Sequence, residues 1–515
     1  MSDRRRARRR EGTKGSATAL EPPAFRQPRL RYRPVEILSA DRIEAIHMAS
    51  LRILRDCGIK LLSPEARSIL SRAGAEVDET SQVVRFDPGF VTETLALAPE
   101  TFTLEARNPG KSLTVGGEHL LFTSVAGPAF VSDLDRGRRQ GTQAEVCDFI
   151  RLIHSFDVIH QEGGGPFEAL DIPQDRRYLD LHVAQITLTD KSWVPWTLGR
   201  VRVRDAIEMA ALAFGTTRER LADRVVLAGV INTNSPLMLD GPMAEGLIEL
   251  ARHGQAVIVT PFTLAGAMAP VTLAGALALQ NAEALAGIVL AQCVRPGAPV
   301  AYGAFTTNVD MRTGSPAFGT PEYAQAAQIS GQLARRYRLP FRSSSATAAN
   351  GCDAQAAYES QMSLWGAVMG GAHIVKHAAG WLNGGLTASF EKLVIDAEML
   401  AMLAAYLDPP DADDASLAVE AIAAVGHGGH FFGAAHTLAR YRTAFYAPVV
   451  SDWSNFENWQ QRGAEDAALR ANRIWKKRLA EYEEPPIDPA IRDAVIDHAE
   501  RRKREIAAGI NVPDC

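Results

Sequence analysis

Short apolar runs recur at regular intervals through the middle of the chain. Each run favours β-structure, ends in glycine, threonine, histidine or an aromatic residue, and precedes a longer stretch rich in Ala and Leu. Short apolar runs bounded by turn residues are typical of buried strands, and the longer stretches are typical of helices. Eight runs follow this pattern: 119–127, 157–165, 192–199, 225–233, 256–266, 299–305, 340–345 and 373–380. The pattern therefore predicts eight strand–helix units.

Eight strand–helix units in one chain indicate an α/β fold of the closed (β/α)8 type, the TIM barrel. We place this barrel at residues 111–410. In such a barrel the side chains that carry out chemistry lie in the loops that follow the carboxyl ends of the strands. We therefore expect the functional site in the residues just after the eight runs.

The segments on either side of the barrel have different patterns. Residues 1–35 are rich in Arg and Pro, which favours a basic disordered tail over an arm for RNA, a membrane or a partner. Residues 36–110 combine two capped helical stretches with short strands, which predicts a small N-terminal α/β unit. Residues 411–515 begin with an Asp- and Pro-rich linker and continue as charged helical segments. We expect this helical C-terminal extension to wrap the barrel or to form a homo-oligomer contact.

Composition argues against several classes of partner. The chain has 515 residues, 46% of them apolar, and a net charge of -5, so no global field favours nucleic acid or an anionic membrane. The stretch 273–293 is long and apolar, but it contains Gln280, Asn281 and Glu283, which predicts a packed helix and not a membrane span. The N-terminal basic run is not followed by the apolar region of a secretion signal.

Cysteines and short motifs narrow the chemistry further. The five cysteines are scattered and contain no CxxC pair, which predicts a reducing cytoplasm and argues against a cysteine-rich metal site. The sequence contains no GxGxxG or GxxxxGK loop for a nucleotide and no GxSxG elbow of a hydrolase. We therefore predict neither a bound nucleotide nor a bound metal.

The residues just after the runs are rich in aromatic side chains and poor in paired acids. Trp196, Phe262, Phe305 and Trp381 all lie at or directly after a predicted strand end. An aromatic site with few charges suits a quaternary ammonium, because each ring attracts the cation by about 0.5–2 kcal/mol. The alternative is that these rings only fill the barrel or pack under its helices.

Four polar residues near the same strand ends are candidates for chemistry: His160, Glu162, Asn350 and His377. His160 and Glu162 would form an acid–base pair if the reaction needed one. His373 and His377 share one face of a predicted strand, but no third ligand is evident, so we do not expect a zinc site.

Five separated segments have distinctive sequences: INTNSPLML (231–239), TLAGAMAPVTLAGALALQ (263–280), the long segment from PVAYGAF to AAYESQ (299–361), GGLTASFEKLVIDAEML (384–400) and GHFFGAAHTLARYR (429–442). Together they resemble the trimethylamine methyltransferase (MttB) family over about residues 35–480.

The resemblance implies a TIM-barrel enzyme that moves a methyl group from a methylated amine to the cobalt of a separate corrinoid protein. Archetypal members carry pyrrolysine in the barrel, whereas this chain shows only the standard amino acids; the loop 346–352 lies near that position. Members that lack pyrrolysine but are similar in the other motifs act on quaternary amines such as glycine betaine. The resemblance therefore implies a quaternary amine substrate and a corrinoid (cobalamin) carried by a cognate partner protein.

Methyl transfer from a quaternary ammonium suits the predicted site. Its leaving group is a neutral tertiary amine, so the reaction needs no general acid. It needs the cation held with one methyl group facing the acceptor. The sequence has no DxHxxG cobalamin motif, so we expect the corrinoid on the partner. A carboxylate on the amine would need a donor, for which Arg312, His377 and Asn350 are the candidates and His377 is favoured.

Two other functions stay open because a fold does not fix a function. The chain could be another barrel enzyme, such as a lyase or hydrolase, with His160 and Glu162 as its acid–base pair. It could also be a sensor that binds quaternary amines without catalysis.

Overall fold

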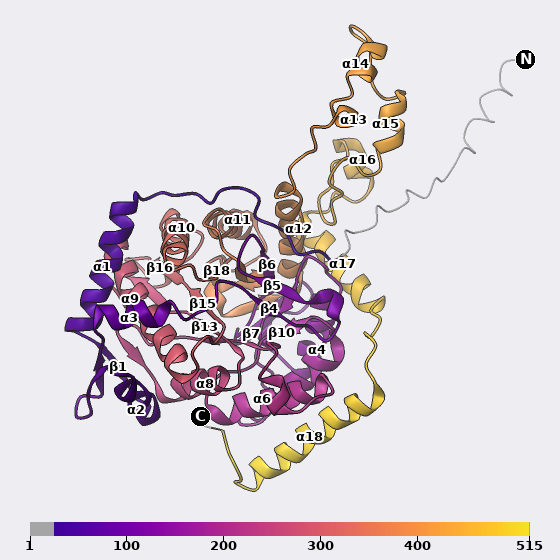
Figure 1. The fold of residues 1–515 in the computed structure, drawn as a ribbon. Coiled ribbons are helices and arrows are strands. Elements are labelled where there is room, and N and C mark those ends of the chain that lie inside the picture. The colour runs from indigo at the N-terminus through magenta and orange to yellow at the C-terminus, as the bar shows by residue number, and fades with distance from the viewer. Residues whose placement is uncertain (1–24, 514–515) are drawn as a thin grey trace, which may run out of the picture. The chain divides into compact units, whose positions relative to one another are not determined.

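The structure is a computed structural model that describes residues 25–513 (Figure 1). The predicted basic tail at 1–35 therefore lies mostly outside the described residues. All eight predicted strands form, and all are parallel members of one sheet in the order β10-β9-β6-β19-β18-β15-β13-β11. Their bounds are β6 (Leu121–Ser124), β9 (Gln161–Glu162), β10 (Ser192–Trp193), β11 (Ala228–Ile231), β13 (Ala256–Val259), β15 (Val300–Gly303), β18 (Phe341–Ser344) and β19 (Ile374–Ala379).

This sheet curls into a nearly closed barrel, so the predicted fold class is confirmed. In the described part of the chain β10 and β11 share no ladder. One hydrogen bond spans this gap, from Thr197 Oγ1 to the Val230 carbonyl at 2.6 Å.

A helix follows each barrel strand, and these helices surround the sheet (Figure 1). In chain order they are α4 (Gln143–His154), α5 (Arg177–Leu188), α6 (Arg200–Ala213), α8 (Gly241–Arg252), α9 (Leu273–Val294), α10 (Pro321–Arg336), α11 (Ala354–Met369) and α12 (Phe390–Tyr406). Their starts follow local rules: the Thr320 side chain accepts from Tyr323 N, and Pro321 takes the first helical position. A short helix, α7 (Arg218–Leu221), lies between α6 and β11.

Helix α9 is the apolar stretch that the sequence predicts to be packed. By length and composition it could cross a membrane, but 83% of its most apolar stretch is buried inside the protein. Its polar residues also have internal partners: Gln280 Nε2 donates to Tyr302 Oη at 2.8 Å, and Leu237 N donates to Glu283 Oε1 at 2.8 Å. It is therefore a core helix.

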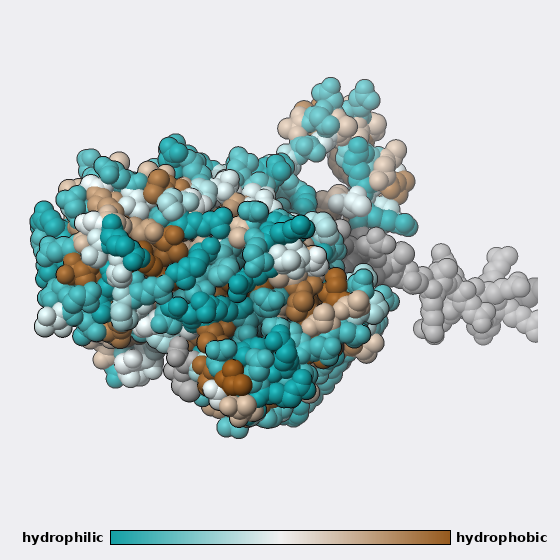
Figure 2. All heavy atoms as spheres, turned by 60° about the horizontal axis from the view of Figure 1, so that its bottom comes forward, coloured by the Kyte–Doolittle hydropathy of each residue, from teal (hydrophilic) through white to brown (hydrophobic). Residues whose placement is uncertain are grey.

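The face drawn in Figure 2 is mostly hydrophilic, with apolar residues in small separate patches.

A β-hairpin fills the amino-terminal end of the barrel. Its strands are β4 (Phe102–Leu104) and β5 (Leu113–Val115), joined through the short helix η2 (Pro109–Lys111). Phe102, Leu104, Leu113 and Val115 pack in one apolar cluster with Leu121, Ala228, Ala256, Ile258, Ala301 and Ile374, most of which begin barrel strands. The interior is therefore closed at this end, and access must come from the carboxyl ends of the strands.

The N-terminal α/β unit packs on the outside of the barrel. It consists of α1 (Ala40–Asp56), β1 (Ile59–Leu61), α2 (Pro64–Ala73), β2 (Glu76–Asp78), β3 (Val83–Arg85) and α3 (Pro88–Leu95). Strand β1 pairs in parallel with β12 (Met238–Leu239), and α1, α2 and α3 all contact α9. This unit and the barrel form one compact body.

The structure divides the predicted C-terminal extension in two. Residues 410–449 form a separate unit with α13 (Asp414–Leu417), α14 (Val419–Val425) and α15 (Ala435–Arg440). Residues 450–513 belong to the barrel body and contain α16 (Phe456–Gln461), α17 (Ala467–Ala480) and α18 (Pro489–Ala507). Helix α17 packs on α12 and α4, and α18 packs along α5 and α6, so this part lies against the helices of the barrel (Figure 1).

Two small sheets continue from the carboxyl ends of the barrel strands. The first contains β14 (Phe262–Ala265), β16 (Phe305–Val309) and β17 (Pro316–Ala317), which follow β13 and β15. The second contains β20 (Trp381–Leu382), β21 (Thr387–Ser389), β7 (Phe130–Asp133) and β8 (Gly137–Gln140), with the short helix η3 (Asn383–Gly385) between β20 and β21. These sheets bring residues from distant parts of the chain to the barrel mouth.

Candidate active site

Six rings gather at the barrel mouth and form what we call the aromatic cluster: Phe262, Phe305, Phe318, Tyr323, His377 and Trp381. Phe305 lies at its centre, with ring centroids 5.2 Å from Phe262 and 6.0 Å from Trp381. Phe262 and Phe305 are register partners on β14 and β16, so the small sheet itself sets their spacing. The cluster is largely buried but reaches solvent at Phe262 and His377.

The Trp381 indole is fixed from two sides. Its Nε1 donates to the Thr347 carbonyl at 3.2 Å, and Thr347 Oγ1 in turn donates to Glu359 Oε2 at 2.5 Å. Gly385 lies directly against the ring: a Cβ at this position would be 2.4 Å from indole carbons, and its φ is +93°. Only glycine fits there, so the turn after β20 holds the ring in one orientation.

His377 has a strained backbone in the middle of this cluster. Its φ is +56°, in the left-handed region that residues with a Cβ rarely adopt, and it lies where the pairing of β19 with β6 shifts register. Its ring centroid is 4.4 Å from Trp381 and 5.6 Å from Phe305. Burial, with the positive charges of Arg342 and Lys376, holds the pKa of His377 well below its usual range, so the ring is neutral near pH 7.

Two buried cationic side chains lie inside the barrel beneath the cluster. Arg342 of β18 is 2% exposed, and its guanidinium carbon is 5.5 Å from the Phe305 centroid. Lys376 of β19 is 3% exposed, and its Nζ donates to the Gly163 carbonyl at 2.6 Å. Burial lowers the pKa of Arg342 to about 10 and that of Lys376 to about 7. The Arg342 charge lowers the pKa of Lys376 further, whereas the Glu162 carboxylate raises it.

Glu162 holds the glycine turn that follows β9. Its carboxylate accepts from Gly164 N and Gly165 N, each at 2.9 Å, and from the Gln185 amide. Burial raises the pKa of this carboxyl group. Trp196 packs on the same turn, where its Nε1 donates to the Gly164 carbonyl at 3.1 Å. Both residues therefore shape the mouth beside Lys376, but Trp196 has no ring contact with the aromatic cluster among the described residues.

Three other predicted site residues lie elsewhere. His160 precedes β9 and is buried; its Nδ1 accepts from Phe122 N, and its Nε2 donates to the Arg26 carbonyl, each at 3.0 Å. In the described residues it makes no hydrogen bond to Glu162, so the acid–base pair considered from the sequence does not form. Arg312 is exposed in the turn between β16 and β17, and Asn350 is exposed in the loop after β18.

The other histidine considered from the sequence, His373, lies just before β19. Its Nδ1 accepts from Phe341 N at 2.8 Å, and its Nε2 is 3.0 Å from the Gly117 carbonyl. It thus lies before the first residue of β19, whereas His377 lies in the second half of that strand. Within residues 25–513, no group of three or more His, Cys, Asp or Glu side chains is placed to hold a metal ion.

Sequence reasoning missed Arg342, Lys376, Phe318 and Tyr323. Arg342 and Lys376 are inside the predicted strands 340–345 and 373–380, and a charged residue within an otherwise buried strand was the available signal. Phe318 and Tyr323 come from the turn before α10 and its first turn. Their rings reach Phe305 only through the tertiary fold.

Comparisons with known proteins give one consistent result. A family model described as trimethylamine methyltransferase matches residues 2–507. A glycine betaine methyltransferase of Desulfitobacterium hafniense (strain Y51) is 36% identical and covers 88% of this chain and 94% of its own length. Trimethylamine methyltransferase MttB of Methanosarcina barkeri (strain Fusaro / DSM 804) is 30% identical and covers 91% of this chain and 96% of its own.

Among solved structures, the Methanosarcina barkeri monomethylamine methyltransferase MtmB matches with a TM-score of 0.51. The match covers 87% of this chain and 88% of that one, at 9% sequence identity. At this identity the likeness concerns the fold alone.

Proposed function

The chain belongs to the trimethylamine methyltransferase family and is a methyltransferase, and from this premise we propose that it demethylates a quaternary amine of the glycine betaine type. The methyl acceptor is the Co(I) of a corrinoid bound to a separate cognate protein. The observation that carries the proposal is the aromatic cluster at the barrel mouth, centred on Phe305 and Trp381. The relative at 36% identity, a glycine betaine methyltransferase, supports the same substrate type.

The aromatic cluster suits a cation that cannot lose its charge by deprotonation. A quaternary ammonium has no N–H, so it gains little from hydrogen-bond acceptors and much from the faces of aromatic rings. Each ring contributes about 0.5–2 kcal/mol, and the larger values apply where the cation is desolvated, as it would be beside these buried rings. His377 is neutral near pH 7, so its ring does not repel the cation.

The reaction requires the protein to position the substrate more than to transfer protons. The electron pair of the breaking N–CH3 bond stays on nitrogen, and the product is a neutral tertiary amine. Co(I) supplies the electron pair of the new bond to the methyl carbon. The rings of Phe305 and Trp381 hold the ammonium, and the contacts of Trp381 with Thr347 and Gly385 keep its ring in place.

The acceptor has one route to the substrate. The β4–β5 hairpin fills the amino-terminal end of the barrel, so the corrinoid partner must approach the carboxyl ends of the strands. We therefore propose that the partner docks around the two small sheets. We propose a cytoplasmic protein, in keeping with its scattered cysteines.

The test mixes the purified protein with chemically reduced cob(I)alamin and one amine at a time, and follows methyl-Co(III) formation by absorbance. We expect methyl transfer from glycine betaine. Calorimetric binding of glycine betaine without any methyl transfer, even with the cognate corrinoid protein added, would instead support a sensor. Absence of both binding and transfer for every quaternary amine would overturn the proposal.

A further inference from the structure

We propose that Arg342 binds the carboxylate of the substrate and so makes the enzyme selective for betaines, quaternary amines that carry a carboxylate, over quaternary amines that lack one. Lys376 lies beside it as a second donor. This inference rests on the proposed function and specifies its substrate class. It moves the carboxylate contact away from Arg312 and Asn350, which are exposed.

Arg342 is a buried cation without a counter-ion. It forms no ion pair with a carboxylate of the described residues. Its one hydrogen bond, from Nη1 to the Ala304 carbonyl, is long at 3.4 Å, and its buried Nε has no partner. A guanidinium has five N–H donors and stays protonated, so leaving it buried and unpaired costs several kcal/mol. A bound carboxylate would satisfy this guanidinium in the bidentate geometry that arginine favours.

The strand register places Arg342 and Lys376 on the inner surface of the barrel. Ile374 packs in the apolar cluster inside the barrel, so Lys376, two residues further along β19, faces the same way. Arg342 is the register partner of Ile374, and Ser344 is the register partner of Lys376. The two side chains therefore lie on neighbouring strands, Arg342 level with Ile374 of the apolar cluster and Lys376 two residues further towards the carboxyl end of its strand.

Other polar atoms on this inner surface are also unsatisfied. Buried atoms with no hydrogen-bond partner include Gln161 Nε2, Ser192 Oγ, Thr260 Oγ1, Ser344 Oγ and His377 Nδ1. Gln161 and Ser192 are register partners on β9 and β10. Thr260 lies against Gly303, where an added Cβ would be 2.0 Å from Thr260 Oγ1, and Gly303 is the register partner of Arg342. Because buried polar groups are normally paired, these unpaired atoms on the inner surface of the barrel indicate a polar ligand group there.

The short distance between Arg342 and the aromatic cluster suits a zwitterionic ligand. The guanidinium carbon is 5.5 Å from the Phe305 centroid, and the Phe262 and Trp381 rings flank Phe305. In glycine betaine only one methylene separates the ammonium nitrogen from the carboxylate carbon, so both ends can bind around this one ring. The positive charge of Arg342 attracts the carboxylate and repels the ammonium. The carboxylate thus lies deep in the barrel, and the methyl groups face the mouth.

This orientation also explains how the site presents one methyl group to an acceptor. Rings alone would hold a nearly spherical trimethylammonium group in many orientations. A fixed carboxylate removes that freedom, so the N–CH3 bonds opposite the carboxylate point toward the carboxyl ends of the barrel strands. Holding the reacting group in line with its acceptor is a large part of the rate enhancement of such transfers.

The test compares glycine betaine with tetramethylammonium, which has the cation but no carboxylate, in the wild type and in Arg342→Met. Affinity is measured by calorimetry, and methyl transfer is measured with cob(I)alamin. In the wild type we expect tighter binding and faster transfer for glycine betaine. In Arg342→Met we expect glycine betaine affinity to fall at least about 30-fold, since one partner of a buried charge pair is lost. Tetramethylammonium affinity should stay equal or rise, because a repulsive charge is gone.

Opposite effects on two ligands separate substrate binding from a structural role. An equal loss of affinity for both ligands, or an unchanged affinity for glycine betaine, would overturn the inference. Arg342→Lys keeps the charge and provides a second variant; it should retain part of the preference for glycine betaine. If the wild type transfers methyl groups from both compounds equally well, the inference fails and the proposed function stands. If it binds neither compound, the proposed function itself fails.

Discussion

Two buried lysines, Lys191 and Lys376, differ in the number of hydrogen bonds that their ammonium groups donate. Lys191 Nζ donates to three backbone carbonyls, those of Ile153, Phe156 and Ile159, at 2.7–2.9 Å. Lys376 Nζ donates to one, the Gly163 carbonyl. Lys191 therefore ties the end of α4 and the following loop to β10, whereas Lys376 keeps donors free for a ligand.

This difference predicts opposite stability effects for two equivalent substitutions. Lys191→Met should lower the free energy of unfolding by about 3 kcal/mol, because three buried carbonyls each lose one hydrogen bond. Lys376→Met should have little effect or a stabilising one at pH 7, because it removes a buried charge with one hydrogen bond. Urea denaturation of both variants measures the contrast, and an equal loss in both would contradict it.

The same lysine gives a pH dependence with a definite sign. The pKa of Lys376 is about 7 in the folded protein because of burial, against an ordinary value of 10.5. Between these values the unfolded chain binds more protons, so this group makes the folded state more stable as pH rises from 7 towards 10.5. The advantage of Lys376→Met over the wild type should therefore be largest below pH 7 and should fade above it.

Trp381 provides the test of the aromatic cluster at single-residue level. Trp381→Leu keeps an apolar side chain but removes the indole face, so glycine betaine should bind about 5–30-fold more weakly, equivalent to about 1–2 kcal/mol. Trp475→Leu is the matched control, because that indole packs on Phe390 and donates to Glu391 on the outside of the barrel. Calorimetry should show a large affinity loss in the first variant alone; equal losses would contradict the cluster's role.

The sequence predicts part of this site, and the reason for the limit is physical. Phe262, Phe305 and Trp381 can be located because they directly follow strands, and strand ends meet at one edge of a barrel. Arg342 and Lys376 are harder to interpret, since their inward direction depends on a strand register that only the folded sheet fixes. His160 illustrates the opposite case: its position beside β9 suggests chemistry, but both its ring nitrogens bind backbone atoms.

At the level of elements, the hydrophobic pattern is sufficient to predict the eight strands and their helices. Every predicted run contains a barrel strand, because a strand buried on both faces is a short continuous apolar run bounded by turns. The pattern does not predict the two small sheets at the mouth. Their strands have only two to five residues, too few for a periodic signal.

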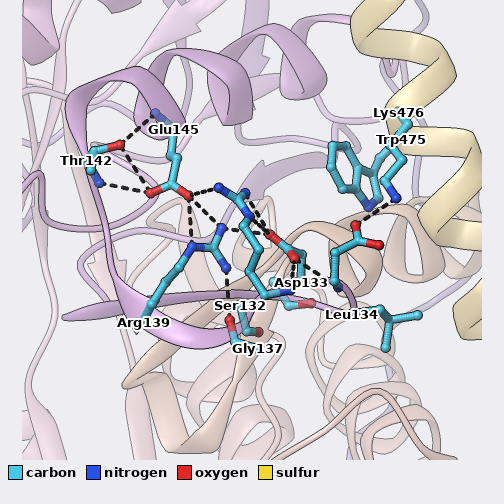
Figure 3. Close-up of polar contacts among 12 residues, drawn as sticks. Ser132, Asp133, Leu134, Gly137, Arg139, Thr142, Glu145, Trp475 and Lys476 are labelled. Carbon is cyan, nitrogen blue, oxygen red and sulfur yellow. Dashed lines mark hydrogen bonds and ion pairs between the residues drawn. The ribbon is translucent and has the colours of Figure 1, made fainter.

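One of these small sheets is secured by a network of arginines and carboxylates (Figure 3). Asp133, at the end of β7, accepts from Arg136 and Arg139, and Glu145 of α4 accepts from the same two arginines. Strand β7 pairs with β21, which pairs with β20, the strand that begins with Trp381. The network therefore supports the sheet that carries the Trp381 ring.

Asp133→Ala should consequently destabilise the protein and loosen the site. The side chain of Asp133 is buried, and its loss leaves the Asp135 and Arg136 backbone N–H groups and one contact of each arginine without an acceptor, which costs about 2 kcal/mol. Asp135→Ala is the control, because Asp135 pairs with Lys476 at 2.7 Å with both side chains roughly half exposed. Such a surface pair contributes at most about 1 kcal/mol. Thermal melts should rank the two variants in this order, and a larger loss for Asp135→Ala would contradict the assignment.

At the scale of the whole molecule, the chain consists of a barrel body and a small separate unit at 410–449. None of the residues in this unit is buried, and several of its aromatic side chains are highly exposed, such as Phe432 at 86% and Phe445 at 83%. A segment without buried residues contributes little to a hydrophobic core. The barrel body should therefore fold without it.

Deletion of residues 412–447, with a short Gly/Ser linker in their place, tests this independence. We expect the melting temperature to stay within about 2 °C of the wild type, since no buried apolar surface is lost. Glycine betaine affinity should also be unchanged, because Arg342 and the aromatic cluster belong to the barrel body. Loss of folding, or a large drop in melting temperature, would show that the unit is part of the core.

The most direct measurement is a crystal structure of the protein with bound glycine betaine. We predict the trimethylammonium group against the rings of Phe305 and Trp381, the carboxylate on the Arg342 guanidinium, and the methyl groups facing the carboxyl ends of the barrel strands. A carboxylate that faces the mouth, or a ligand bound away from these residues, would contradict the account.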